Sequence, residues 1–114
     1  MHAAAVAGVD GNLLAVREDV GRHNAIDKAV GACLYAGHAM GSCLLVSTGR
    51  ASSEMALKAV RAGVPVAASL SGSTSLGVEL ADRLGLTLVC YLRAASMTVL
   101  AHPERIVGAA SASA

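Results

Sequence analysis

The residues best suited to chemistry are concentrated in the stretch R-E-D-V-G-R-H-N-A-I-D-K at positions 17–28. Charged residues make up only 15% of the chain, yet seven of these twelve are ionisable: Arg17, Glu18, Asp19, Arg22, His23, Asp27 and Lys28. Arginine forks suit phosphate oxygens, and a carboxylate such as Glu18 or Asp27 can accept from the N1 and N2 edge of a guanine. The stretch predicts an anion-binding site, with His23 or Asn24 as an orienting hydrogen-bond partner.

Two further polar turns have residues that suit phosphate binding. T-G-R-A-S-S (48–53) and S-G-S-T-S (71–75) supply glycine, hydroxyls and backbone amides just before predicted helices. The candidates here, with one arginine beyond the last long strand, are Gly49, Arg50, Ser52, Ser71, Gly72, Ser73 and Arg93. Neither G-x-x-x-x-G-K-[ST] nor G-x-G-x-x-G is present. The alternative interpretation is that these residues only cap helices and that the charges form exposed ion pairs.

Apolar runs bounded by turn residues predict the strands that position these turns. They cover residues 2–6, 13–18, 43–48, 66–69 and 86–92, with a short edge piece at 97–100. The first two flank G-V-D-G-N at 8–12, which predicts an antiparallel hairpin.

Helical patterns fill the intervals between the later strands. The helix boundaries expected from capping residues and glycines are Asn24 to Gly37, Ser52 or Ser53 to Gly63, and the 71–75 turn to Gly85. The side chains expected to face the sheet are Ile26, Val30, Cys33, Leu34, Met55, Ala59, Ala62, Leu76, Leu80 and Leu84. Glu54 and Lys58 have the spacing of an i,i+4 ion pair.

This order of elements predicts an α/β fold. Successive strand-helix-strand steps cross over right-handedly, which gives a mostly parallel five-stranded sheet with one antiparallel strand. We expect helices on both faces, as in a three-layer α/β/α sandwich. Every polar turn described above follows a strand, so all of them are expected at one edge of the sheet, where ligands bind in open α/β proteins.

The composition of the 114 residues excludes several classes of function. A net charge of +1 and only two aromatic residues argue against binding nucleic acid. The uncharged stretch 29–49 is interrupted by glycine and polar residues, so no membrane span is expected. The amino-terminal residues lack the basic region of a signal peptide, and we expect a cytoplasmic protein. Residues 1–107 are expected to form one domain and 108–114, which lack any pattern, a disordered tail.

The three cysteines are predicted to be reduced core residues. Cys33, Cys43 and Cys90 are widely spaced in apolar segments, and no C-x-x-C occurs. The four histidines show neither H-x-E nor i,i+4 spacing, so no metal site is predicted. No Ser, His and acid set of a hydrolase is recognisable.

Several segments together resemble the carboxy-terminal domain of the FdhD/NarQ family, the formate dehydrogenase accessory proteins. They are H-A-A-A, R-E-D-V-G-R-H-N-A-I-D-K-A-V-G, S-T-G-R-A-S-S-E-M-A-L-K-A, A-G-V-P-V, L-T-L-V-C-Y-L-R and A-H-P-E-R-I, in this order between residues 2 and 106. The resemblance implies a cytidine-deaminase-like fold and a homodimer. It also implies a sulfurtransferase that passes sulfur from a cysteine desulfurase to the molybdenum bis(molybdopterin guanine dinucleotide) cofactor of formate dehydrogenase, with GDP as a mimic of the cofactor's nucleotide.

One departure from the family pattern separates two hypotheses. The family's working cysteines lie on a loop upstream of a Gly-Gly-x-His element, whereas this chain begins at the x-His of that element, so no residue of this chain is assigned a catalytic role. The first hypothesis is a sulfurtransferase-family domain that holds the cofactor's nucleotide. The second is a truncated, non-catalytic domain that only binds the molybdopterin guanine dinucleotide or the partner enzyme. The zinc elements of deaminases are absent, so the fold implies no deaminase activity.

Overall fold

A β-hairpin begins the fold in the computed structural model, which describes residues 1–107. β1 (His2–Gly8) pairs antiparallel with β2 (Leu13–Asp19), as predicted. Asp10 Oδ1 accepts a 3.0 Å hydrogen bond from the Asn12 amide, and Gly11 has a φ of +88°. Residues with a side chain rarely adopt that angle, so Gly11 is what allows the turn to be this tight.

The sheet has six strands rather than the five predicted. The remaining strands are β3 (Cys43–Ser47), β4 (Val66–Ser69), β5 (Thr87–Cys90) and β6 (Thr98–Ala101). Their order is β2-β1-β3-β4-β5-β6, with β3, β4 and β5 parallel. β1 and β6 run antiparallel to their neighbours, so the sheet has two antiparallel strands rather than the one predicted. The additional one is β6, because residues 98–101 pair along β5 as a full edge strand.

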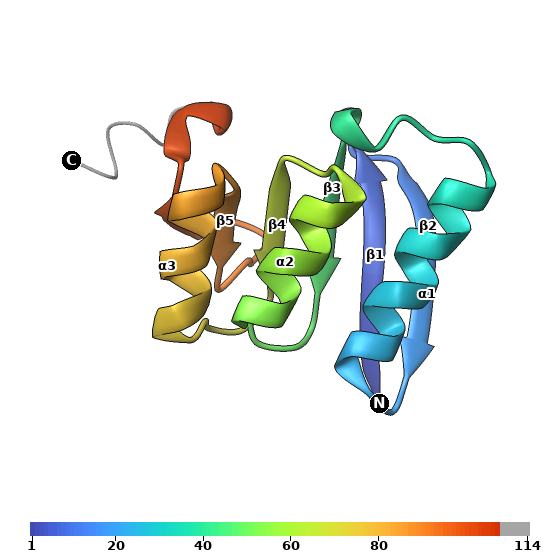
Figure 1. Cartoon of the computed structure of the whole chain (residues 1–114), viewed down its shortest axis with the longest axis horizontal. Coiled ribbons are helices and arrows are strands. Elements are labelled where there is room, and N and C mark those ends of the chain that lie inside the picture. The colour runs from blue at the N-terminus through green and yellow to red at the C-terminus, as the bar shows by residue number, and fades with distance from the viewer. Residues whose placement is uncertain (108–114) are drawn as a thin grey trace.

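Three helices lie side by side on one face of this sheet, in front of it in Figure 1. They are α1 (Arg22–Tyr35), α2 (Ser53–Ala62) and α3 (Ser75–Leu84), and short 3-10 turns follow at Met40–Ser42 and Pro103–Arg105. The connections β2 to β3, β3 to β4 and β4 to β5 all step in the same direction across the sheet, so right-handed crossovers place all three helices on the same side.

The α/β class is therefore as predicted, but residues 1–107 form two layers, without helices on the second face of the sheet. On that face, β1 and its neighbours present small and aliphatic side chains. Ala3, Ala5, Val16, Val46 and Leu70 line a shallow hollow of about 160 Å³ there. The tail at 108–114 lies outside the described residues.

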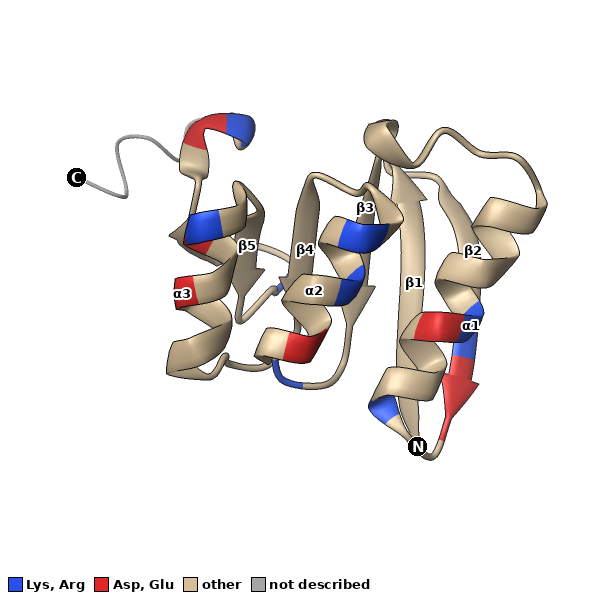
Figure 2. Ribbon diagram, in the orientation of Figure 1, with Lys and Arg blue, Asp and Glu red and all other residues tan. Residues whose placement is uncertain are grey.

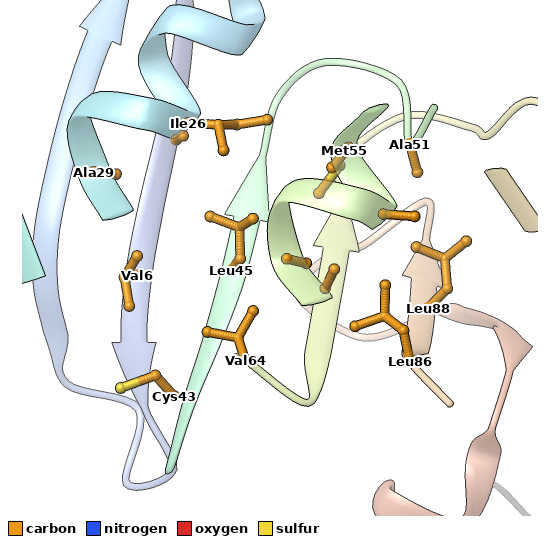
Figure 3. Close-up of a cluster of buried hydrophobic side chains, with 14 of the residues drawn as sticks. Val6, Ile26, Ala29, Cys43, Leu45, Ala51, Met55, Val64, Leu86 and Leu88 are labelled. Carbon is orange, nitrogen blue, oxygen red and sulfur yellow. The ribbon is translucent and has the colours of Figure 1, made fainter. Parts of the chain in front are cut away.

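The core fills the space between the sheet and the three helices. Figure 3 shows Val6, Leu45 and Leu88 pointing from the strands toward Ile26 and Met55 of the helices. Alanines occupy many of the other buried positions, and the chain contains no Phe or Trp. Small side chains allow the helix backbones to approach the sheet closely, so packing here depends on fit rather than on bulk.

The start of α1 and one residue of its buried face differ from the prediction. α1 begins at Arg22 with Gly21 as its N-cap, and Asn24 instead donates from Nδ2 to Asp19 Oδ1 at 3.4 Å. Asp19 Oδ1 also accepts from the Gly21 amide at 2.9 Å, so Asp19 fixes the start of the helix. Leu34 is 54% exposed, because the buried face of α1 is made of smaller residues and Ile26.

The face of α3 was predicted correctly only at Leu80, which packs against the core. Leu76 and Leu84 are exposed, whereas Gly77 and Ala81 are buried against the rest of the fold. Gly77 and Ala81 each follow a leucine by one position, so they form their own stripe of small residues along α3. This stripe is the buried one, because small residues let the helix backbone approach the rest of the fold closely.

The ion pairs of α2 connect helices instead of running along one helix. Lys58 Nζ lies 2.7 Å from Asp27 Oδ1 of α1, and Glu54 Oε2 lies 3.3 Å from His23 Nε2. The predicted Glu54–Lys58 pair is not formed, because each residue has a partner on α1. Within residues 1–107 no helix is both long and apolar enough to span a bilayer.

Candidate functional site

The carboxyl ends of β2, β3, β4 and β5 meet at one edge of the sheet, the lower edge in Figure 1. β1 runs in the opposite direction, so its first residue, His2, reaches the same edge. The starts of α1, α2 and α3 follow directly from these strand ends. The prediction that the three polar turns share one edge is confirmed by this topology.

A hollow of about 350 Å³ opens at this edge, and we call it the rim pocket. Its lining residues are His2, Arg22, Thr48, Gly49, Arg50 and Ser71. Four of them, Arg22, Gly49, Arg50 and Ser71, are predicted site residues. No Asp or Glu is among the lining residues, so the positive charge of the pocket is not neutralised from within.

Gly49 lets the Arg22 side chain pack directly against the turn that lines the rim pocket. A Cβ atom at Gly49 would lie 2.8 Å from Arg22 Cδ and 3.0 Å from its Cβ. The Gly49 amide donates to Ser47 Oγ at 3.1 Å, and its carbonyl accepts from Ser69 Oγ at 2.6 Å. The glycine is therefore fixed from the core side and covered by arginine on the other.

Hydrogen bonds join the turn after β3 to the turn after β4. The Ala51 amide donates to the Gly72 carbonyl at 3.0 Å, and the Thr74 amide donates to the Ala51 carbonyl at 3.1 Å. The Ser71 amide donates to Ser69 Oγ at 3.0 Å. These bonds hold both walls of the pocket as one unit before any ligand arrives.

Unpaired hydrogen-bond donors surround the pocket. The guanidinium groups of Arg22 and Arg50 form no ion pair or hydrogen bond with any residue in 1–107. The Gly49 and Ser71 amides, which we expected to bind phosphate, donate to serine hydroxyls, but the Arg50, Gly72 and Ser73 amides have no acceptor within the described range. Figure 2 shows basic ribbon segments at the start of α1 and in the turn before α2. Such donors suit a phosphate or pyrophosphate group.

Most charges of the 17–28 stretch have partners away from the rim pocket. Lys28 Nζ lies 2.7 Å from Asp19 Oδ2 and also donates to the Glu18 carbonyl at 3.3 Å. Arg17 Nη1 donates to the Val16 carbonyl, and Asp27 pairs with Lys58 of α2. Of this stretch only Arg22 lines the rim pocket, while Arg17, Asp19, His23, Asp27 and Lys28 have partners elsewhere.

The other predicted site residues have structural contacts. Arg93 Nη1 donates to the carbonyls of Leu70 and Leu92 at 2.6 and 2.9 Å, so it fixes the turn after β4. Ser52 caps α2 by accepting from the Met55 amide at 3.3 Å. His23 Nε2 faces Glu54, and its Nδ1 atom is buried with no partner among residues 1–107.

Sequence reasoning missed His2 and Thr48 as pocket residues. Thr48 Oγ1 accepts from the Ala3 amide at 3.0 Å, which ties the start of β1 to the end of β3. His2 reaches the pocket only because β1 lies between β2 and β3. The x-His of the family element was the one signal in the sequence that could have identified it.

None of the three thiols lines the rim pocket. Cys33, Cys43 and Cys90 are free and at most 4% exposed. Burial raises the pKa of the Cys33 and Cys90 thiols, which disfavours the thiolate form that attacks sulfur. No group of three or more His, Cys, Asp or Glu residues that could hold a metal is found in residues 1–107.

We predict that acid removes the stabilising effect of Asp19. The hydrogen bonds from Lys28 and the Gly21 amide lower the pKa of Asp19 from 3.8 to about 2. Because the folded pKa lies below the unfolded one, this contribution is complete above the unfolded pKa and is lost as the pH falls from about 4 toward about 2. Urea unfolding of the wild-type protein and Asp19→Asn should show a stability difference that is constant near neutral pH and shrinks over that window. A difference unchanged down to pH 2 would contradict the assignment.

Comparison with known proteins gives consistent matches over the described residues. A family model, that of the FdhD/NarQ family, matches residues 1–107. The protein named "Sulfur carrier protein FdhD" from Mycobacterium tuberculosis is 50% identical over 107 residues, which cover 93% of this chain and 39% of that protein. The protein of the same name from Streptomyces coelicolor is 52% identical over 107 residues, covering 93% and 38%. The chain thus spans about two fifths of the length of these curated relatives.

Solved structures match as well. A crystal structure assigned to a formate dehydrogenase accessory protein from Desulfotalea psychrophila superposes with a TM-score of 0.83 at 42% identity, covering 92% of this chain and 47% of that one. The dCMP deaminase of cyanophage S-TIM5 gives a TM-score of 0.58 at 17% identity, covering 76% and 77%. The second likeness concerns the fold alone and confirms the predicted deaminase-like architecture.

Proposed function

Because this chain belongs to the FdhD/NarQ family, we propose that it provides the anion-binding part of a sulfur-carrier accessory protein for formate dehydrogenase. One observation carries this proposal: the guanidinium groups of Arg22 and Arg50, which have no partner among residues 1–107, share a pocket that no carboxylate lines. Unpaired arginines are common on protein surfaces, but these two converge on one hollow beside unpaired backbone amides, and that convergence favours an external anion.

The ligand that we propose for the rim pocket is the guanine nucleotide end of the molybdenum bis(molybdopterin guanine dinucleotide) cofactor. Its pyrophosphate would accept from Arg22, Arg50 and the unpartnered amides of Arg50 and Gly72. The cofactor is the cargo of the reaction, and the pocket residues hold its anionic end. In the whole protein, sulfur would pass from a cysteine desulfurase to this cofactor before delivery to formate dehydrogenase, in the cytoplasm and within a homodimer.

A second candidate, a non-catalytic binding module, is favoured by the state of the cysteines. Cys33, Cys43 and Cys90 are buried and lie outside the rim pocket. A persulfide on any of them would have no direct path to a ligand in the pocket. For residues 1–107 alone, the proposed role is therefore to hold the cofactor while the sulfur-carrying group acts from elsewhere.

Calorimetric titration with GDP tests the binding proposal. We expect saturable binding that weakens as salt rises, because the phosphates are held by exposed or half-exposed cations. Inorganic pyrophosphate should compete with GDP for the same site. If neither GDP nor pyrophosphate binds to the folded chain, the proposed function of this pocket is excluded.

Persulfide labelling separates the two candidates. The chain is incubated with a cysteine desulfurase and cysteine, and thiol persulfides are then detected by mass spectrometry. We expect no persulfide on the three cysteines of the folded chain, since the thiols are buried and two have raised pKa values. Stoichiometric labelling of one of them would favour a sulfur-carrying role for this part of the protein.

A further inference from the structure

Tyr91 has a backbone conformation that residues with bulky side chains rarely adopt. It directly follows β5, and its φ is +53°. Two hydrogen bonds impose this conformation: the Tyr91 amide donates to the Ser71 carbonyl at 2.9 Å, and the Leu92 amide donates to the Ser69 carbonyl at 3.2 Å. Strained conformations of this kind persist where the surrounding structure holds them, and they concentrate at ligand sites.

The Tyr91 side chain rests on the turn that forms one wall of the rim pocket. A Cβ atom at Gly72 would lie 2.6 Å from the Tyr91 hydroxyl oxygen and 3.1 Å from Cζ, so only glycine fits beneath the hydroxyl end of the ring. Gly72 directly follows Ser71, a lining residue of the pocket, and its own amide has no acceptor within residues 1–107. The ring is thus anchored beside the Gly72 amide, which we propose to donate a hydrogen bond to the phosphate.

Core packing does not explain this placement, because Tyr91 is 52% exposed. Its hydroxyl forms no hydrogen bond within the described residues, so no polar contact accounts for it either. The chain has no Phe or Trp, and its other tyrosine, Tyr35, is 97% exposed at the end of α1 farthest from the pocket edge. Tyr91 is therefore the single Phe, Tyr or Trp side chain that this fold places next to the rim pocket.

We propose that Tyr91 is the stacking platform for the base of the nucleotide whose phosphates occupy the rim pocket. This inference rests on the proposed function and adds to it a residue that selects for a planar base. The contact with Gly72 holds the hydroxyl end of the ring, which leaves ring surface open to a ligand. Stacking needs only the ring, so the hydroxyl is dispensable, and the anion site itself does not depend on Tyr91.

Tyrosine fluorescence tests the contact directly, because the chain contains no tryptophan and only two tyrosines. In Tyr35→Phe, Tyr91 is the sole emitter, and saturating GDP is expected to quench it, whereas inorganic pyrophosphate is not. The Tyr91→Phe protein retains only Tyr35 and corrects for light absorbed by GDP. Equal loss of signal in the two proteins would overturn the proposal.

Affinities then distinguish the base contact from the anion contact. Tyr91→Ala should weaken GDP binding by about 5- to 150-fold, the usual range for loss of one aromatic–base stack, with pyrophosphate binding unchanged. Tyr91→Phe and the matched control Tyr35→Ala should bind GDP within about twofold of the wild-type protein. Tyr91→Gly provides a second variant that folds without backbone strain, since glycine adopts a positive φ freely, and it should lose GDP affinity to the same extent.

The outcomes separate the base platform from the pocket. Wild-type binding of GDP and pyrophosphate with unchanged GDP affinity in both Tyr91→Ala and Tyr91→Gly overturns the stacking role but leaves the anion pocket intact. An equal loss of GDP and pyrophosphate affinity also overturns it, since Tyr91 would then act on the phosphates. Binding of neither ligand by the wild-type protein overturns the proposed function and this inference together.

Discussion

Replacing both Arg22 and Arg50 by alanine will abolish measurable binding of GDP and pyrophosphate while the fold remains intact. Each guanidinium that pairs with a phosphate contributes about 1.5–3 kcal/mol through charge-assisted hydrogen bonds. Each single substitution should therefore weaken binding by about 10- to 150-fold. Because neither side chain has a partner in the described part of the chain, its removal leaves no orphaned carboxylate there, and the free energy of unfolding should change by no more than about 0.5 kcal/mol. Calorimetry and urea unfolding of the same samples measure both quantities.

Arg61→Ala is the matched control for the arginine substitutions. Arg61 is exposed in the last turn of α2 and, like Arg22 and Arg50, forms no ion pair or hydrogen bond within residues 1–107. Its removal lowers the net charge by the same amount but at a different surface, so binding should stay within about twofold of the wild type. A loss equal to that of Arg22→Ala would mean that overall charge, rather than the rim pocket, attracts the anion.

Gly49→Ala tests the position of Arg22 without removing its charge. The new methyl group would meet Arg22 Cδ at 2.8 Å, so the arginine side chain must leave its place against this turn. We expect an intermediate loss of GDP affinity together with a modest loss of stability, because Arg22 Cδ can rotate away whereas Arg22 Cβ, 3.0 Å from the new methyl group, is fixed to the backbone of α1. Unchanged affinity would show that Arg22 binds the ligand from another position.

The sequence predicted the edge of the sheet at which the pocket forms, because strand order and crossover direction follow from local patterns. Alternation of apolar strands with capped helices places Gly49, Arg50 and Ser71 after parallel strands, and parallel strands share a carboxyl edge. His2 could not be placed in this way. Its position depends on β1 being inserted between β2 and β3, a long-range pairing that the hairpin pattern alone does not specify.

Partners of charged side chains were the least predictable part of the site. The 17–28 stretch has a high density of charge, but density does not reveal that Lys28 pairs with Asp19 whereas Arg22 pairs with no other residue of the 107 described. The Asp27–Lys58 pair joins two helices that are far apart along the chain, so helical spacing suggested the wrong partner for Lys58. Only the three-dimensional arrangement distinguishes paired ions from the two arginines that are available to a ligand.

The buried face of α3 was also hard to predict from the sequence, because it depends on a contact with a distant part of the chain. Leucine spacing selects one face, but the close contact between α3 and the loop before α2 requires a residue without a side chain. A Cβ atom at Gly77 would collide with the Ala51 carbonyl oxygen. That oxygen already accepts from the Thr74 amide at 3.1 Å, so it cannot move without breaking the bond that joins the two pocket turns. This contact couples the packing of α3 to the geometry of the rim pocket.

Gly77→Ala will therefore destabilise the protein, although replacing glycine by alanine inside a helix is normally favourable by about 0.5–1 kcal/mol. The collision involves backbone on both sides, and such overpacking costs about 1–3 kcal/mol, which would lower Tm by roughly 5–20 °C in a domain of this size. Gly31→Ala in α1 is the matched control, because Gly31 is exposed and a Cβ atom there meets nothing within 4 Å. Thermal unfolding should show a small gain for Gly31→Ala and a large loss for Gly77→Ala. Equal gains in both variants would mean that α3 can move away from Ala51 at little cost, and that the two turns of the pocket are not held together by this helix.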